Sequence, residues 1–407
     1  MKLEVKKKAL NIGSTVMLLV LFWNIVALTA IGATDSGNPN NIVPLACGYG
    51  QNLVLKNNGD VWTWGDNWNG RLGYGTMVNR TSPIQIPNLS GITAVAAGQL
   101  HSLALKHDGT VWAWGYNNDG QLGNGFTDEY PSTVVQVQGL SEVTAIAVHG
   151  GRSMALKSDG SVWVWGDTSF SMHGDTRYVD HYIPVKVPNL NGITAIAAGG
   201  LCNLALKSNG TVWVWGINAF GVFGDGGNGE HRKRLIEDIP VQVPNLSDVI
   251  AIESGSTHNI ALTSDGSVWT WGQNVYGELG DGTTNARFTP YKVPYISDVK
   301  AIATGGCHCL ALKKDNSLWA WGSNWAGQLG DGSKTPQSIP VRVQGISEVM
   351  AFAAGNVHSM AIKNDGSVWS WGNNYSGQLG DGTTINQTKP VPVLTSDGGS
   401  FLSDISY

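Results

Sequence analysis

Hydrophobic and polar positions repeat along the chain with a period close to fifty residues. Within one unit, residues 92–97 form a run of small and β-branched side chains, and residues 102–106 alternate. Residues 110–114 also alternate, with both tryptophans on one side. Such patterns are typical of strands. With a fourth short strand expected at 134–137, each unit is predicted to be a four-stranded antiparallel meander.

A turn signal separates the second predicted strand from the third. The pair Asp108-Gly109 favours a tight two-residue hairpin whose backbone needs positive φ. The signal recurs as Asp159-Gly160, Asn209-Gly210, Asp265-Gly266 and Asp365-Gly366. These units are therefore expected to pair their strands in the same way.

The tetrapeptide Trp-x-Trp-Gly marks every unit. Its first tryptophan stands at positions 62, 112, 163, 213, 269, 319 and 369. A sheet with Trp on one face and Leu or Val on the other must stack on neighbours to bury both faces. An open stack needs polar caps at its ends, yet the end units keep the apolar pattern of the middle ones. The array is therefore predicted to close as an all-β, seven-bladed propeller.

The predicted propeller spans residues 41–394. Its blades are expected at approximately 41–90, 91–141, 142–191, 192–247, 248–297, 298–347 and 348–394. Residues 35–40 are expected to form a short linker and residues 395–407 a C-terminal tail. The sequence leaves open whether the strand at 390–393 completes the seventh blade or pairs with the first.

An apolar segment precedes the repeats. Lysines at positions 2, 6, 7 and 8 come before the apolar run 16–33, which ends in small residues. This is the three-part pattern of a secretory signal peptide, here residues 1–34. The run is also long enough for an uncleaved signal-anchor helix. Either way, the propeller is expected outside the cytoplasm, secreted or anchored in the membrane through this segment alone.

Composition and charge narrow the possible partners. The 407 residues include 54 Gly and only 14% charged residues, against about 25% in an average soluble domain. This favours a turn-rich β protein. The net charge is −5, and because residues 1–34 carry +3, the remainder carries −8. An acidic body has no electrostatic basis for holding phosphates, so no nucleic-acid partner is expected.

The repeat resembles the regulator of chromosome condensation family of seven-bladed propellers. That family's unit carries G-x-x-H-S-x-A-L, D-G-x-V-W-x-W-G and G-Q-L-G-x-G. The second unit matches at Gly98, His101, Ser102, Ala104, Leu105, Asp108, Gly109, Trp112, Trp114, Gly115, Gly120, Gln121, Leu122, Gly123 and Gly125. The resemblance covers residues 41–394 and implies the fold, whereas propellers host many unrelated functions.

The resemblance implies less about activity. The founding member of the family is a nuclear exchange factor for a small GTPase that also docks on chromatin. This chain carries an export signal, is acidic, and lacks a basic nuclear tail and a long inserted wedge. Exchange activity is therefore not expected, and an exported, bacterial-type member fits better. One exported relative, a secreted β-lactamase inhibitory protein, clamps an enzyme on one propeller face, but its shorter repeats do not allow its contact residues to be carried over.

An aromatic residue follows each Trp-x-Trp-Gly within four residues. These candidate binding residues are Trp68, Tyr116, Phe170, Phe220, Tyr276, Trp325 and Tyr375. Equivalent loops would place them as a ring on one face, and binding hot spots concentrate at such surfaces. The alternative is that each ring packs beneath its own Gly-rich loop. Arg232 and Arg234, in an insertion of the fourth unit, are further candidates for contacting an anionic partner, although a solvated loop is the simpler interpretation.

Histidine and cysteine also invite a metal hypothesis. The second strands begin with Gln51, His101, Arg152, Cys202, His258, His308 and His358. Three consecutive units thus offer His beside Cys307 and Cys309. Hydrogen bonding near the axis is the favoured interpretation, and neither a metal nor another cofactor is expected. The cysteines Cys47, Cys202, Cys307 and Cys309 lack the spacing of a disulfide framework, so free thiols are expected.

Catalytic motifs are missing from the sequence. There is no Gly-x-Ser-x-Gly, His-Glu-x-x-His or P-loop, so an enzyme is not expected. The predicted function is that of an exported, monomeric scaffold whose loop face binds an extracellular protein or a cell-surface polymer. Two alternatives stay open, an inhibitor of an extracellular enzyme and a carbohydrate-active enzyme built on a propeller.

Overall fold

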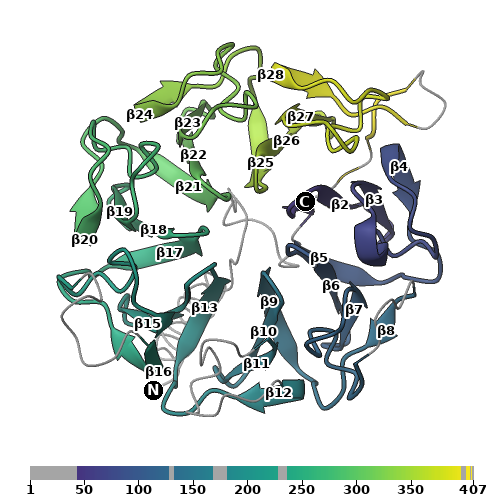
Figure 1. Cartoon of the computed structure of the whole chain (residues 1–407), viewed down its shortest axis with the longest axis horizontal. Helices are drawn as coiled ribbons and strands as arrows, with labels where there is room; N and C mark the ends of the chain where they lie inside the picture. The colour runs from purple at the N-terminus through teal and green to yellow at the C-terminus, as the bar shows by residue number, and fades with distance from the viewer. Residues whose placement is uncertain are drawn as a thin grey trace, which may run out of the picture.

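Seven four-stranded antiparallel sheets stand around a central axis in the computed structural model (Figure 1). The structure describes residues 44–127, 133–167, 181–227, 236–395, 400–403 and 405. Every sheet is built from four consecutive strands in simple meander order. The predicted all-β, seven-bladed propeller of four-stranded blades is therefore confirmed.

The first strand of each blade lies nearest the axis and the fourth lies at the rim (Figure 1). The innermost strands are β1 (Leu45–Cys47), β5 (Ile92–Ala97), β9 (Val143–His149), β13 (Ile193–Ala198), β17 (Val249–Ser254), β21 (Val299–Thr304) and β25 (Val349–Ala354). The second strands are β2 (Gln51–Leu55), β6 (His101–Lys106), β10 (Arg152–Lys157), β14 (Cys202–Lys207), β18 (His258–Thr263), β22 (His308–Lys313) and β26 (His358–Lys363).

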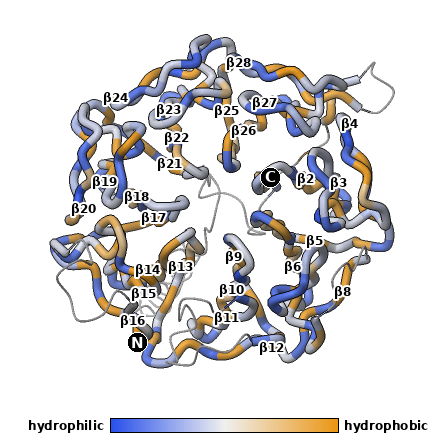
Figure 2. Tube along the Cα trace, viewed as in Figure 1, coloured by the Kyte–Doolittle hydropathy of each residue, from blue (hydrophilic) through white to orange (hydrophobic). Residues whose placement is uncertain are grey.

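The third strands carry the tryptophan pairs. They are β3 (Val61–Gly65), β7 (Val111–Gly115), β11 (Val162–Gly166), β15 (Val212–Ile217), β19 (Val268–Gly272), β23 (Leu318–Gly322) and β27 (Val368–Gly372). The outer strands are β4 (Arg80–Gln85), β8 (Val135–Gln136), β12 (His181–Lys186), β16 (Ile236–Gln242), β20 (Arg287–Lys292), β24 (Gln337–Arg342) and β28 (Gln387–Pro392). A short 3-10 turn, η1 (Trp68–Gly70), follows β3. The blades carry both hydrophobic and hydrophilic segments along their strands (Figure 2).

The hairpin between the second and third strands is longer than predicted. Gly109 N donates to Lys106 O, and Lys106 N donates to Thr110 O, both at 2.9 Å. His107, Asp108 and Gly109 thus form a three-residue loop in which Gly109 has a φ of 77°. The carboxylate of Asp108 accepts hydrogen bonds from the backbone N and hydroxyl of Thr110. The two-residue prediction is wrong because this side-chain contact stabilises a turn with only one left-handed residue.

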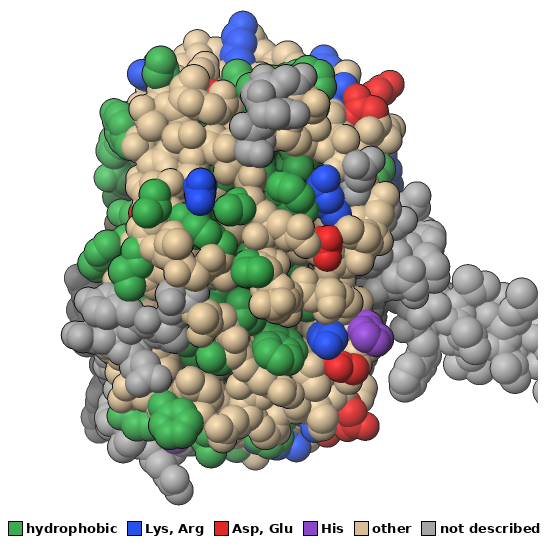
Figure 3. All heavy atoms as spheres, turned by 90° about the vertical axis from the view of Figure 1, so that its right-hand side faces the viewer, with side chains coloured by type: hydrophobic (Ala, Val, Ile, Leu, Met, Phe, Trp, Pro, Cys, Tyr) green, Lys and Arg blue, Asp and Glu red, His purple; other side chains and the backbone are tan. Residues whose placement is uncertain are grey.

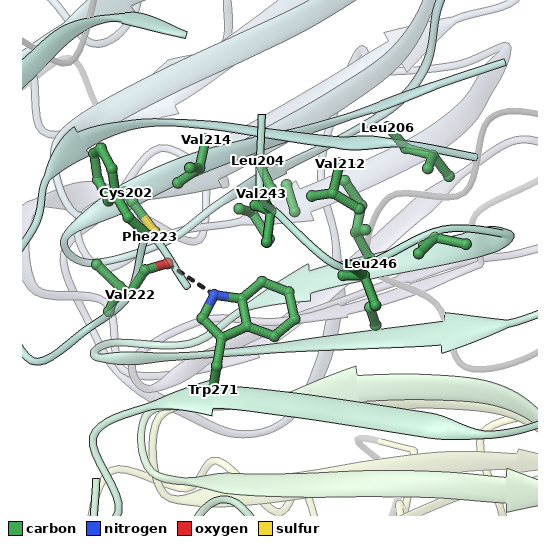
Figure 4. Packing of buried hydrophobic residues seen from close by; sticks show 14 of the residues in the cluster. Cys202, Leu204, Leu206, Val212, Val214, Val222, Phe223, Val243, Leu246 and Trp271 are labelled. Atoms are coloured by element: carbon green, nitrogen blue, oxygen red, sulfur yellow. Dashed lines mark hydrogen bonds between the residues drawn. The ribbon is translucent and has the colours of Figure 1, made fainter. Parts of the chain in front are cut away.

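The second tryptophan of each pair fills the space between neighbouring blades. In Figure 4, Trp271 of β19 lies against Val212 and Leu246 of the preceding blade, and its indole N donates to Val222 O of that blade at 2.8 Å. The same bond to the preceding blade is made by Trp64, Trp114, Trp165, Trp321 and Trp371. The indole ring contributes apolar burial, and its only donor is satisfied. These residues hold the stack of blades together.

The ring closes between the seventh and first blades with the bonds that the other seams use. Asn356 N donates to Gly48 O at 3.0 Å near the axis, and Gly382 N donates to Thr81 O at 2.9 Å near the rim. The outer strand β28 pairs with β27, so it completes the seventh blade. The question left open by the sequence is thereby answered.

Residues beyond the last strand also enter this seam. Leu402 and Ile405 are buried beside Leu45 and Trp64 of the first blade. Leu402 also joins the ladder of the seventh blade, because its N donates to Val393 O at 2.9 Å.

Among the described residues no helix has the length and apolar character of a membrane span. The predicted signal at 1–34 lies outside those residues.

Candidate binding face

Antiparallel meanders divide the connections of the propeller between two faces. The loops from first to second strand and from third to fourth strand share one face, here called the loop face. The hairpins from second to third strand, and the connections between blades, share the opposite face, here called the hairpin face. In the side view, acidic side chains gather along one edge of the disc and hydrophobic side chains along the other (Figure 3).

Five exposed apolar side chains follow the third strands of consecutive blades on the loop face. Val275, Trp325, Tyr375 and Trp68 occupy the fourth position after the second tryptophan in blades five, six, seven and one, with exposed fractions of 54, 60, 76 and 63%. Phe220 of blade four lies one position further along and is 47% exposed. We call these five residues the apolar arc.

The predicted ring of aromatics divides into several kinds of position. Packing beneath the Gly-rich loop is wrong for Trp68, Phe220, Trp325 and Tyr375, which are exposed. Tyr116 and Tyr276 are half-buried, while Phe170, Arg232 and Arg234 lie outside the described residues. A binding role for any of these residues stays a prediction.

Sequence reasoning missed several exposed apolar residues of this face, namely Tyr49, Met77, Val78, Phe126, Val275 and Ile385. Val275 does not belong to a pattern of aromatic residues, although it shares the position of Trp325 in its own blade. Tyr49, 49% exposed, lies in the loop between β1 and β2 at the mouth of the central channel. The signal that could have found Tyr49 is its departure from the small or polar residues that most other blades place in this loop, such as Gly200, Ser256 and Asn356.

The second blade contributes no residue to the apolar arc, although its buried tryptophan Trp114 packs between blades as in the rest of the ring. Asn118 occupies the position of Trp68 there and is exposed. A shared packing requirement would place similar residues in all blades, as it does for the buried tryptophans. The arc is therefore not required by the fold.

Neighbouring groups hold two rings of the arc in place. Tyr276 meets Trp325 edge to face across the boundary between blades five and six, with centroids 4.6 Å apart and an angle of 73°. Arg71 Nε donates to Trp68 O at 2.9 Å, and the guanidinium carbon lies 5.9 Å from the Trp68 ring centroid. Arg71 is itself paired with Asp66 at 3.3 Å. Such contacts reduce the side-chain freedom that a bound partner would otherwise have to restrict.

Charged groups in the four loops 66–79, 273–286, 323–336 and 373–386 are mostly withdrawn from solvent. Arg71 and Glu278 are 2% and 1% exposed, and Asp281 is 6% exposed and paired with Arg287 at 2.7 Å. Burial lowers the pKa of Arg71, and the Asp66 charge acts in the opposite direction. Lys334 is the one exposed charged residue of these described loops. Asp66, Asp331 and Asp381 are half-buried, so these loops present few fully exposed charges.

A buried polar residue supports each of these loops from behind. Gln378 Oε1 accepts a hydrogen bond from Ser376 N at 2.8 Å, and Gln328 makes the equivalent contact in blade six. Glu278 takes this place in blade five, where its Oε2 accepts from Tyr276 N at 2.8 Å. Burial raises the pKa of Glu278, and its Oε1 has no hydrogen-bond partner among the described residues. Glu278 thus takes the structural place that Gln occupies in the neighbouring blades.

The histidines that suggested a metal instead tie adjacent blades together. Each Nε2 lies within hydrogen-bond distance of a side chain in the next blade, at 2.7–2.9 Å for His101, His308 and His358. Burial lowers the pKa of His101 and His308 to about 3 and that of His258 and His358 to about 4. The described residues contain no group of three or more side chains able to hold a metal ion.

One histidine faces a thiol in an arrangement that resembles a nucleophile and its base. His258 Nε2 lies 3.3 Å from Cys309 Sγ and 2.7 Å from the Thr304 hydroxyl. His258 and Cys309 are fully buried, and burial raises the pKa of the thiol far above its usual value. A neutral thiol beside a neutral imidazole in the protein interior is a structural contact, because nucleophilic cysteine needs a thiolate that a substrate can reach. All four cysteines are free thiols.

The central channel opens on the loop face and encloses about 110 Å³. Its wall consists mainly of small residues of the innermost strands. Glu253 stands where the other blades have Ala, and His149 stands where they have Gly. Burial lowers the pKa of His149 to about 3. The loop face therefore combines a narrow channel lined mainly by small residues with an outer apolar arc.

The fold defines the class of protein as a closed seven-bladed propeller whose blades are tied together by buried tryptophans and histidines. The comparisons with known proteins agree with this class. The family model described as the RCC1-like domain matches residues 26–355, and models of the regulator of chromosome condensation (RCC1) repeat match residues 351–378 and 365–406. The chain belongs to the family of RCC1-like propellers.

Several relatives place the chain within that family. The E3 ubiquitin-protein ligase HERC2 of Homo sapiens is 31% identical over 243 residues, which are 58% of this chain and 5% of HERC2. The ultraviolet-B receptor UVR8 of Arabidopsis thaliana is 28% identical over 64% of this chain and 59% of UVR8. The chain thus spans less than two thirds of these curated relatives.

Among solved structures, Prp20p of Saccharomyces cerevisiae is 25% identical, with a TM-score of 0.74 over 88% of this chain and 87% of that chain. Prp20p has binding properties toward Gsp1p and histones. Human WBSCR16 shares the fold at 24% identity, with a TM-score of 0.71 over 80% of this chain and 87% of that chain. Propellers of this family thus include proteins that act by binding other macromolecules.

Proposed function

We propose that this protein is an exported, non-enzymatic scaffold that binds a protein or a surface polymer outside the cytoplasm through its loop face. The observation that carries the proposal is the apolar arc, which is exposed on blades four to one and interrupted at Asn118. Apolar side chains that the fold does not need are costly to leave in water. A partner that covers them explains their presence.

A non-enzymatic role fits the chemistry of the candidate catalytic groups. The seam histidines are neutral and hydrogen-bonded between blades, and the pKa of Cys307 is raised to about 11 by burial and by the nearby Glu278. General bases act best when their pKa lies near the working pH. These residues support the fold rather than a reaction.

Export is inferred from the lysines at positions 2, 6, 7 and 8 followed by the apolar run 16–33. Alkaline phosphatase fused after residue 40 tests this part of the proposal, because that enzyme gains activity only in an oxidising compartment. Activity that disappears when the apolar run is interrupted by charged residues is the expected result. Equal activity with and without the run would contradict export.

Binding is tested by affinity capture with purified residues 35–407. The double variant Trp68→Ala/Trp325→Ala is expected to lose the partner while keeping its unfolding midpoint. Tyr295→Ala is the matched control, because Tyr295 is 57% exposed in the connection between β20 and β21 on the hairpin face. Retention of the partner by the double variant, or its loss in Tyr295→Ala, would contradict a binding role for the loop face.

A further inference from the structure

Three side-chain amides of the loop face reach solvent, whereas in blade one the position of Gln273 and Asn373 carries Asp66, which is paired with Arg71. Gln273, Asn356 and Asn373 are half-exposed on the loop face within blades five and seven. The side-chain amides of Gln273 and Asn356 make no hydrogen bond to other described residues. Asn373 Oδ1 accepts from Tyr375 N and Gln378 Nε2, which leaves its NH₂ group for a ligand. The loop face thus offers open amide donors and acceptors as well as exposed rings.

The scarcity of exposed cations in the four loops of blades one, five, six and seven disfavours two kinds of partner. Single-stranded nucleic acid is held on stacking rings only together with a positively charged groove, whereas the charged residues Arg71 and Glu278 of these loops are buried. Anionic lipid surfaces likewise need clustered Lys or Arg. A charge-poor aromatic surface also suits a protein interface, so a protein partner is kept as an outcome of the test.

A neutral sugar chain carries the apolar and polar groups that this surface is suited to bind. One face of a pyranose ring carries C–H groups that pack on an aromatic ring, while its hydroxyls and acetamido groups exchange hydrogen bonds with amides. Trp325 and Trp68 present their rings as rigid platforms, because Tyr276 and Arg71 hold them. A flat, exposed ring with an open amide nearby suits such a ligand better than a deep apolar pocket would.

The repeat also sets the spacing of the platforms. Sheets that pack face to face are about 10 Å apart, so successive platforms lie at least about that far apart, which is about the length of two sugar rings. The arc places one apolar side chain on each of five consecutive blades. An extended polymer can contact several of them at once, and linked weak contacts reinforce one another.

We propose that the apolar arc is a binding site for a neutral glycan chain, in which Trp325, Tyr375 and Trp68 stack on sugar rings and Gln273, Asn356 and Asn373 bond their polar substituents. This inference rests on the proposed function, since it names the partner of the same loop face. It requires no reaction, because the glycan is bound and released unchanged.

Affinity electrophoresis of residues 35–407 tests the proposal. The probes are glycol chitin and hydroxyethylcellulose, both neutral, with alginate as the acidic control polymer. The protein is expected to be retarded by at least one neutral polymer and not by alginate. Trp68→Ala/Trp325→Ala is expected to weaken binding at least tenfold, and Asn356→Ala several-fold, whereas Tyr295→Ala on the hairpin face leaves retardation unchanged.

The outcomes separate this proposal from the broader one. Absence of retardation by both neutral polymers, or retardation that persists in the double variant, would overturn the glycan site. If the double variant nevertheless loses a captured protein, the loop face still binds and only its partner is different. An equal loss of binding in the Tyr295→Ala variant would overturn both proposals. Circular dichroism of each variant excludes misfolding as the cause of a loss.

Discussion

Trp321 and Trp325 lie four residues apart and have opposite surroundings. Trp321 is fully buried between blades five and six and donates to Glu278 O at 2.9 Å. Trp325 is 60% exposed on the loop face and touches Tyr276 at its edge. The first position carries tryptophan in every blade, whereas the second varies from Trp to Asn. The comparison teaches that one repeat contains both a residue that builds the ring and a residue that the ring only displays.

The largest expected effect comes from removing the buried member of this pair. Trp321→Ala opens a cavity next to Ile260 and Leu262 and leaves Glu278 O without its donor. A loss of about 3–5 kcal/mol in the free energy of unfolding is expected, as for other large core truncations. Denaturant unfolding measures it. Trp325→Ala is the matched control and should cost at most about 1.5 kcal/mol, the size of its edge contact with Tyr276. Equal losses in the two variants would contradict the distinction between the two positions.

Low pH is expected to reduce the free energy of unfolding through the histidines between the blades, without affecting the exposed residues of the arc. The seam histidines have folded pKa values of about 3 to 4, below the unfolded value of about 6.5. Protons therefore bind the unfolded chain first, so stability is complete above pH 6.5 and falls as the pH drops towards 4. Each such histidine contributes about 1.4 kcal/mol per pH unit.

His308→Gln sharpens this prediction, because Gln51 occupies the same position in the first blade. The variant should lose one histidine's share of the pH dependence, visible as a shallower plot of unfolding free energy between pH 6.5 and 4. An unchanged slope would mean that His308 is already charged in the folded protein.

A smaller effect is expected from the ring that braces the arc. Tyr276→Ala removes the edge contact with Trp325, a contact of about 0.5–1.5 kcal/mol. Affinity for the partner should fall about two- to tenfold, as measured by titration. In a Trp325→Ala background the same change should have no further effect. A full additional loss there would show that Tyr276 contacts the partner directly.

The smallest effect on stability is expected from extending the arc. Asn118→Trp places an indole on blade two, at the position of Trp68 and Trp325. Because the position is exposed, the free energy of unfolding should change by less than about 0.5 kcal/mol, while affinity for an extended partner rises. A loss above about 1 kcal/mol would show that the position has a packing role.

The sequence predicted the ring well because the same pattern of strands and paired tryptophans recurs in seven units. The Trp-x-Trp-Gly spacing and the apolar end units were sufficient to infer closure. The hairpin at Asp108-Gly109 was predicted too short, because the contact of Asp108 with Thr110 depends on geometry that composition does not record.

The arc was only partly predictable, since the aromatic residues occupy three different loop positions that are not equivalent. Tyr116 follows its second tryptophan by two residues, Trp325 by four and Tyr276 by five. Of these three, only Trp325 is exposed. Tyr276 packs against Trp325 of the next blade, and Tyr116 is half-buried. Exposure in a loop depends on backbone direction, which a pattern of residue types does not specify.

Hydroxyl-radical footprinting with mass spectrometry tests most directly whether the arc is the contact surface. In the protein alone, Trp325, Tyr375 and Tyr295 should be oxidised and Trp321 should be inert. With the neutral polymer or the captured partner bound, Trp325 and Tyr375 are expected to become protected while Tyr295 stays reactive. Protection of Tyr295 with undiminished oxidation of Trp325 and Tyr375 would contradict the account.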